Sequence, residues 1–101
     1  MKNEEINIKN NEFLRQFEAM VDDDFIKLEY SEQERKIFLS KFIIDDKNTK
    51  NGVSEKFLTA VFDYVLDKGR TRIVPTSKEV RKFFKANKHK YEELLPIGMS
   101  I

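Results

Sequence analysis

The spacing of apolar residues changes once along the chain, and the change separates a strand-rich first part from a second part that contains helices. Apolar and polar residues alternate at residues 6–8, within 13–21 and at 25–30, and a longer apolar run covers 37–44. A period of two predicts β-strands, and the short polar connections at 22–24 and 31–34 favour antiparallel hairpins. We therefore expect four strands before residue 45.

The second part is predicted to alternate helix and strand. Residues 53–65 carry apolar positions at helical spacing over a wide arc, and Gly69 follows where a helix would end. Residues 71–74 are predicted to form a fifth strand, and Thr76 with Glu79 has the spacing of a capping box that begins a second helix. The order β-β-β-β-α-β-α predicts an α+β fold with a mostly antiparallel sheet. A β-α-β crossover makes its last two strands parallel, and the helices pack on the sheet.

Composition limits the chemistry that the chain can perform. A length of 101 residues and a hydrophobic fraction of 40% predict a single globular domain, residues 1–101. The absence of cysteine and the single histidine exclude disulfides, thiolate nucleophiles and Cys- or His-rich metal sites, so we expect no metal. The first residues do not resemble a signal peptide and no apolar run could span a bilayer, so we expect a cytoplasmic protein without membrane contact.

Charge is distributed unevenly along the chain. Residues 1–46 contain 7 Lys/Arg and 12 Asp/Glu, whereas residues 47–101 contain 12 and 6. Between residues 68 and 90 there are nine basic residues and one acidic residue, Glu79. Any single lysine is explained by a solvated surface, but the concentration favours a polyanionic partner, either a phosphorylated cofactor or a nucleic acid.

The connection between the fourth strand and the first helix is a candidate anion site. A polar turn over residues 45–52 ends in Asn51-Gly52, and the helix begins with Val53 and Ser54. The unpaired N–H groups and the dipole of a helix N-terminus attract anions. An Asn-Gly pair also forms ordinary turns that bind nothing, so the turn alone leaves both interpretations open.

These segments together resemble the minimal GNAT family of small, single-domain acetyl-CoA-dependent N-acetyltransferase-like proteins. The resemblance extends over residues 6–95. It is carried by the helix at 57–65, by residues 68–76, which are similar to the family's "G-x-x-(I/V)-(V/I)-P" strand, and by Val80, Tyr91 and Leu94. The resemblance implies a GNAT-like fold and acyl-CoA-dependent N-acyltransferase activity, with acetyl-CoA or a related acyl-CoA as co-substrate. It does not specify the amine acceptor.

The resemblance also implies roles for individual residues. Acetyl-CoA would lie between the strands at 37–44 and 71–74, and its binding residues would be Ile43, Ile44, Thr49, Lys50, Asn51, Gly52, Val53 and Ser54. Lys41 stands where the family has histidine and Ser77 stands where it has cysteine, so these two are the candidate catalytic residues. A serine hydroxyl needs an adjacent base, for which Glu79, His89 and Lys41 are candidates. Alternatively, Ser77 caps a helix and Lys41 reaches solvent.

Two other functions remain open from the sequence. One is a catalytically inactive GNAT-fold scaffold that binds a protein partner. The other is a nucleic-acid-binding domain that uses the basic residues 68–90. The nucleic-acid function is disfavoured because Phe83 and Phe84, which adjoin the lysines, have the helical spacing of core residues.

Overall fold

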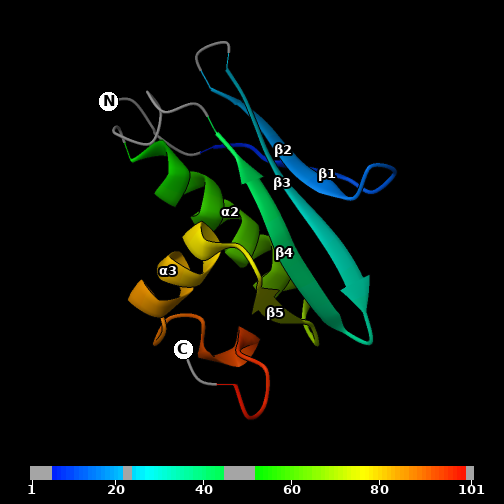
Figure 1. The fold of residues 1–101 in the computed structure, drawn as a ribbon, viewed down its shortest axis with the longest axis vertical. Helices are drawn as coiled ribbons and strands as arrows, with labels where there is room; N and C mark the ends of the chain where they lie inside the picture. The colour runs from blue at the N-terminus through cyan, green and yellow to red at the C-terminus, as the bar shows by residue number, and fades with distance from the viewer. Residues whose placement is uncertain (1–5, 22–23, 45–51, 100–101) are drawn as a thin grey trace.

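The computed structural model describes residues 6–21, 24–44 and 52–99, and it contains five strands, two α-helices and one 3-10 helix in these ranges (Figure 1). In chain order the elements are β1 (Lys9–Asn11), β2 (Gln16–Val21), β3 (Asp24–Gln33), β4 (Lys36–Ile43), α2 (Val53–Lys68), β5 (Arg72–Pro75), α3 (Lys78–Ala86) and η1 (Glu92–Leu94).

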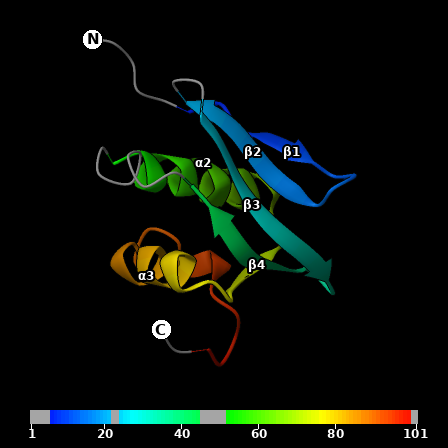
Figure 2. The same cartoon turned by 45° about the horizontal axis from the view of Figure 1, so that its top comes forward.

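The strands form one sheet in the order β1-β2-β3-β4-β5. The first four pair as antiparallel neighbours, and β5 pairs in parallel with β4, to which α2 connects it. Both helices lie on the same side of the sheet (Figures 1 and 2). The predicted α+β class, the mostly antiparallel sheet and the crossover helix are therefore confirmed.

The first predicted strand is in the wrong place. Residues 6–8 are not in a strand, and β1 is formed instead by the polar residues that follow, with Asn10 opposite Phe17. Ile6 and Ile8 pack against the core as partly buried side chains without strand pairing. The polar strand is stabilised because its side chains find partners, as when Asn11 donates from Nδ2 to Glu18 over 2.9 Å.

The turn predicted at residues 31–34 is also wrong, because β3 continues to Gln33. The chain reverses over Glu34 and Arg35, whose φ angles are 52° and 65°. Two consecutive residues with positive φ form the kind of tight hairpin turn that matches the twist of its strands. Polar residues therefore extend the strand because β4 supplies their backbone partners.

An irregularity in β4 decides which side chains face the helices. Tyr30 of β3 pairs with Leu39, but Glu29 pairs with Lys41, so Ser40 is an extra residue in β4. Such a β-bulge reverses the alternation of the strand beyond it. Phe42 therefore faces the core on the same side as Leu39, and Lys41 faces away from it.

The core contains an aromatic cluster that joins the two helices to the C-terminal segment. The ring of Phe62 in α2 lies 4.9 Å from that of Phe83, 5.2 Å from that of Phe84 and 5.0 Å from that of Tyr91. Phe62, Phe84 and Tyr91 are fully buried. Burial raises the pKa of the Tyr91 phenol, whose hydroxyl donates to Asp63 Oδ1 over 2.8 Å. The cluster therefore fixes α3 against α2.

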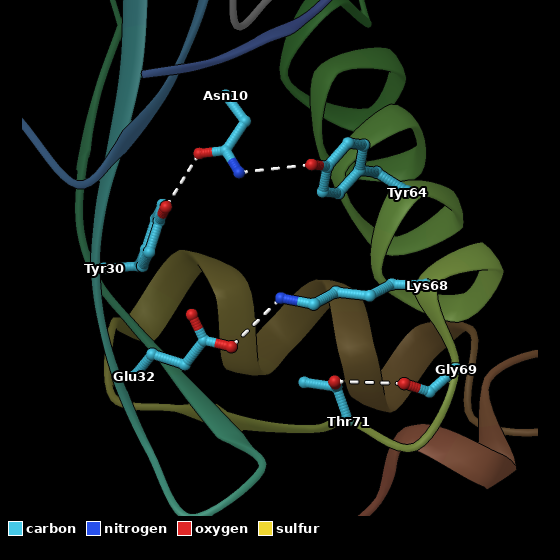
Figure 3. A network of polar contacts seen from close by, with 7 residues as sticks. All are labelled: Asn10, Tyr30, Glu32, Tyr64, Lys68, Gly69 and Thr71. Carbon is cyan, nitrogen blue, oxygen red and sulfur yellow. Dashed lines mark hydrogen bonds and ion pairs between the residues drawn. The ribbon is translucent and has the colours of Figure 1, made fainter. Parts of the chain in front are cut away.

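Polar contacts attach the C-terminal half of α2 to the first strands (Figure 3). Tyr30 donates from its hydroxyl to Asn10 Oδ1 over 2.7 Å, and Asn10 Nδ2 donates to the Tyr64 hydroxyl over 3.2 Å. Lys68 forms an ion pair of 3.0 Å with Glu32. These contacts hold the C-terminal end of α2 against the first strands of the sheet.

Among the residues that the structure describes, no helix has the length and apolar character required to cross a membrane.

Candidate functional site

A groove of about 410 Å³ lies where the end of β4, the first turns of α2 and the exposed side of α3 meet. These three segments are far apart in the sequence, and the β4-α2-β5 crossover brings them together (Figure 1). The residues that line the groove are Phe42, Ile44, Ser54, Glu55, Leu58, Glu79, Lys82, Phe83 and Ala86.

The groove begins where β5 stops pairing with β4. The last paired residues of the two strands are Leu39 and Pro75. After Pro75, the backbone N–H groups of Thr76 and Ser77 both donate to the carbonyl oxygen of Leu39, over 3.1 and 3.2 Å, and the Thr76 hydroxyl donates to it over 3.0 Å. The chain then turns into α3. Beyond Leu39, β4 therefore has no described strand on its β5 side.

The wall formed by β4 is apolar because the bulge turns Phe42 inward. The Phe42 ring stacks on that of Phe57 in α2 at a centroid distance of 5.6 Å and an interplanar angle of 12°. Leu58 and Phe83 continue the apolar wall on the two helices. This apolar wall of the groove therefore suits a slender, largely uncharged segment of a ligand.

The N-terminus of α2 contributes the polar end of the groove. The helix begins after Gly52, which makes no side-chain capping bond, and the N–H of Lys56 donates to the Gly52 carbonyl over 3.2 Å. The first turn of a helix carries N–H groups that its own carbonyl oxygens do not satisfy. Its positive dipole end therefore lies beside the groove.

The predicted acetyl-CoA-binding residues have different environments in the structure. Ile44 and Ser54 line the groove, and Val53 is buried at the start of α2. Ile43 is 40% exposed and pairs with Lys27, on the face of the sheet turned away from the helices. Thr49, Lys50 and Asn51 lie outside the described residues. The binding role of each residue stays a prediction.

Gly52 has a left-handed backbone conformation, with φ of 73° and ψ of 10°. A Cβ atom at this position would meet no heavy atom within 4 Å, so the cost of a side chain comes from the backbone alone. We expect Gly52→Ala to lower the free energy of unfolding by about 1 kcal/mol, and Gly52→Asn by less, because asparagine tolerates this conformation better than alanine. Urea denaturation of the two variants measures the difference. Equal stability of wild type and Gly52→Ala would contradict the assigned conformation.

Ser77 is buried at the start of α3, and its hydroxyl donates to Glu79 Oε1 over 2.8 Å. The predicted capping box of Thr76 with Glu79 is wrong, because Ser77 is the N-cap residue and the Thr76 hydroxyl bonds to β4 instead. The Ser77 hydroxyl, together with a backbone N–H, holds the pKa of the Glu79 carboxyl below its usual value. Glu79 is therefore an ionised carboxylate in the groove wall at neutral pH.

Lys41 lies on the other face of the sheet. Its backbone pairs with Glu29 beyond the bulge, and its side chain is exposed. The two candidate catalytic residues therefore have different surroundings. Ser77 is connected to the groove through Glu79, whereas Lys41 is directed toward solvent. His89 is likewise exposed, in the segment that follows α3.

Several residues of the groove were not identified from the sequence. Phe42, Leu58 and Phe83 look like ordinary core positions, and they line the groove because β5 stops short. Glu79 was considered as a base for Ser77 from the sequence, and the structure places the two side chains in hydrogen-bond contact. Lys82 had no distinguishing signal among the nine basic residues of segment 68–90.

Comparison with known proteins gives a family and a fold. A family model described as GCN5-related N-acetyl-transferase matches residues 16–94. The solution NMR structure of a GCN5-like protein from Staphylococcus aureus superimposes with a TM-score of 0.69. The two are 17% identical over 97% of this chain and 94% of the other. At this identity the likeness concerns the fold, and it confirms the GNAT-like architecture. The comparison with curated proteins gave no match.

Proposed function

Because the chain belongs to the GCN5-related N-acetyl-transferase family, we propose that it transfers an acetyl group from acetyl-CoA to an amine. The observation that carries the proposal is the groove at the point where β5 leaves β4. It is bordered on one side by the N-terminus of α2 and on the other by α3. Proteins of this family typically use acetyl-CoA.

The residues of the groove fit acetyl-CoA. The pantetheine arm is slender and uncharged, and it matches the apolar wall formed by Phe42, Leu58 and Phe83. Main-chain groups of Ile43 and Ile44 would align its amides. The diphosphate is anionic and matches the first-turn N–H groups of α2, at Val53 and Ser54. Thr49, Lys50, Asn51 and Gly52 are proposed as further diphosphate-binding residues, and of these Gly52 lies within the described residues.

In the proposed reaction, acetyl-CoA supplies an activated acetyl group as a thioester. The nitrogen of a neutral amine forms a bond to the thioester carbonyl carbon, the C–S bond breaks, and CoA leaves as a thiolate. The amine loses one proton in the process. We assign this proton transfer to Ser77 with Glu79, because a serine hydroxyl requires an adjacent base and Glu79 Oε1 is 2.8 Å away. The Ser77 hydroxyl would take the amine proton and give its own proton to Glu79, which would then return a proton to the CoA thiolate. Lys41, the other candidate from the sequence, is exposed on the opposite face of the sheet and does not line the groove, so the proposed reaction gives it no step.

Direct titration with acetyl-CoA tests the proposal. At a concentration one hundred times the dissociation constant, a ligand that binds only the folded state raises the free energy of unfolding by about 2.7 kcal/mol. We therefore expect acetyl-CoA to raise the denaturation midpoint in a concentration-dependent manner, and isothermal titration calorimetry to give saturable binding. Adenosine and sodium acetate serve as controls, because neither contains the pantetheine arm.

The absence of any heat or stabilisation at millimolar acetyl-CoA would overturn the proposal. It would leave a fold of this family that acts as a scaffold for a protein partner. If acetyl-CoA binds but none of a panel of amines is acetylated, the proposed binding site is supported. The next experiment would then screen further amines as acceptors. Displacement of acetyl-CoA by unrelated oligonucleotides would instead point to a polyanion surface.

A further inference from the structure

The groove contains one positive charge among the described residues that line it. Its three charged side chains are Glu55, Glu79 and Lys82, so two carboxylates face a single ammonium group. The CoA head group carries a diphosphate and a 3′-phosphate, which the two carboxylates repel. This inference rests on the proposed function, because it concerns the same ligand. If acetyl-CoA binds in this groove, a cationic side chain is required near its phosphates to offset the repulsion from the two carboxylates.

Lys82 is available for this role. Its side chain is exposed, and no ion pair involves it within the described part of the chain, where the recorded pairs are Lys27 with Glu29 and Lys68 with Glu32. The nearest acid on the same helix face, Glu79, accepts the hydrogen bond from Ser77. Within the described residues the Lys82 ammonium therefore forms no ion pair with an acidic residue of α3.

The spacing along α3 places Lys82 at the edge of the groove. Glu79, Lys82, Phe83 and Ala86 recur at intervals of three and four residues, which defines one face of a helix, and all four line the groove. Arg81 does not line it, because it lies on the opposite side of the same helix. The other polar wall is formed by the first turn of α2, so an anion in the groove would have α2 amides on one side and Lys82 on the other.

We propose that Lys82 binds a phosphate group of acetyl-CoA and thereby makes the groove selective for CoA thioesters over thioesters that lack the nucleotide. Lys82 Nζ donates a charge-assisted hydrogen bond to a phosphate oxygen and takes no part in the transfer of the acetyl group. Its role is to position the co-substrate so that the pantetheine arm enters between α2 and α3.

Calorimetric dissociation constants for two ligands and two variants test the role of Lys82. For Lys82→Ala we expect the affinity for acetyl-CoA to fall about fivefold to tenfold, the range of one charge-assisted hydrogen bond at a partly exposed site. The affinity for S-acetylpantetheine, which has no 3′-phosphate or adenylate, should stay within a factor of two. Arg81→Ala removes the same charge from the neighbouring residue and should leave both affinities within that factor. Circular dichroism confirms that both variants fold.

A third ligand, the acetyl thioester of dephospho-CoA, distinguishes the two sources of phosphate. If Lys82→Ala no longer affects binding of this ligand, Lys82 contacts the 3′-phosphate; if the loss persists, it contacts the diphosphate. The proposal is overturned if acetyl-CoA binds Lys82→Ala as tightly as wild type, if Arg81→Ala loses as much affinity, or if S-acetylpantetheine loses affinity equally. A wild-type protein that does not bind acetyl-CoA at all overturns the proposed function instead, so the two failures are distinguishable.

Discussion

Replacement of Phe62 by alanine is expected to lower the free energy of unfolding by about 3–5 kcal/mol. Phe62 is fully buried and its ring contacts three other aromatic rings, from α3 and from the segment before η1. Alanine would remove its dispersion contacts and leave a cavity that the surrounding rings fill only in part. A domain of this size is stable by about 5–15 kcal/mol, so the loss would take a large share of the total.

Urea denaturation followed by circular dichroism measures the effect of Phe62→Ala. The midpoint should fall while the dependence on urea concentration stays the same, which shows a loss of stability and not a change in the exposed surface. Phe13→Ala is the matched control, because the same atoms are removed from a side chain that is 94% exposed in the turn after β1. It should change the free energy of unfolding by less than about 0.5 kcal/mol. Similar effects of the two substitutions would contradict the assigned core.

The parts of the fold that follow from local chemistry were predicted correctly. Helix α2 combines helical spacing of its apolar residues with Gly69 at its end, where φ is 77°. The parallel pairing of β4 and β5 follows because the helix between them forms a crossover connection, which returns the chain to the same end of the sheet. In these cases the residues of the element itself, and those directly after it in the sequence, are enough to predict the element, and its tertiary contacts do not alter it.

The errors arose where a tertiary partner satisfies residues that look unsuited to their element. β1 consists of Lys9, Asn10 and Asn11, and it forms because the partners of Asn10 lie on β3 and α2, which are distant in the sequence. The bulge at Ser40 has no distinguishing composition. Without the bulge, strict alternation would place Lys41 on the core side of β4 with Leu39. The register of β4 with β3 shows which side chains of β4 face the core, and the pattern of apolar residues in β4 alone does not contain that register.

The sequence identified the connection from β4 to α2 as a candidate anion site, and this stays a prediction. Residues 45–51 lie outside the described residues, and the described residues on either side of them that line the groove are Ile44 and Ser54. The contribution of α3 depends on where β5 stops pairing, which is set by three hydrogen bonds to the carbonyl of Leu39. Only the folded arrangement shows that Glu79 and Lys82 belong to the same groove as Ser54.

The location of acetyl-CoA in this groove leads to a second prediction of large effect. Ala86 is the last residue of α3, is exposed, and lines the groove. Tryptophan at this position would extend a large ring system toward Phe42 and Ile44 and occupy the space that the pantetheine arm requires. We expect Ala86→Trp to weaken acetyl-CoA binding by about a hundredfold, equivalent to about 2.7 kcal/mol, as measured by calorimetry.

The matched control for the obstruction is Ala86→Ser, which changes the same position with one added atom and should bind acetyl-CoA within a factor of two of wild type. Because Ala86 is exposed, both variants should unfold within about 0.5 kcal/mol of wild type, so a loss of binding cannot be attributed to a loss of folding. If Ala86→Trp binds acetyl-CoA normally while wild type also binds it, the ligand lies elsewhere.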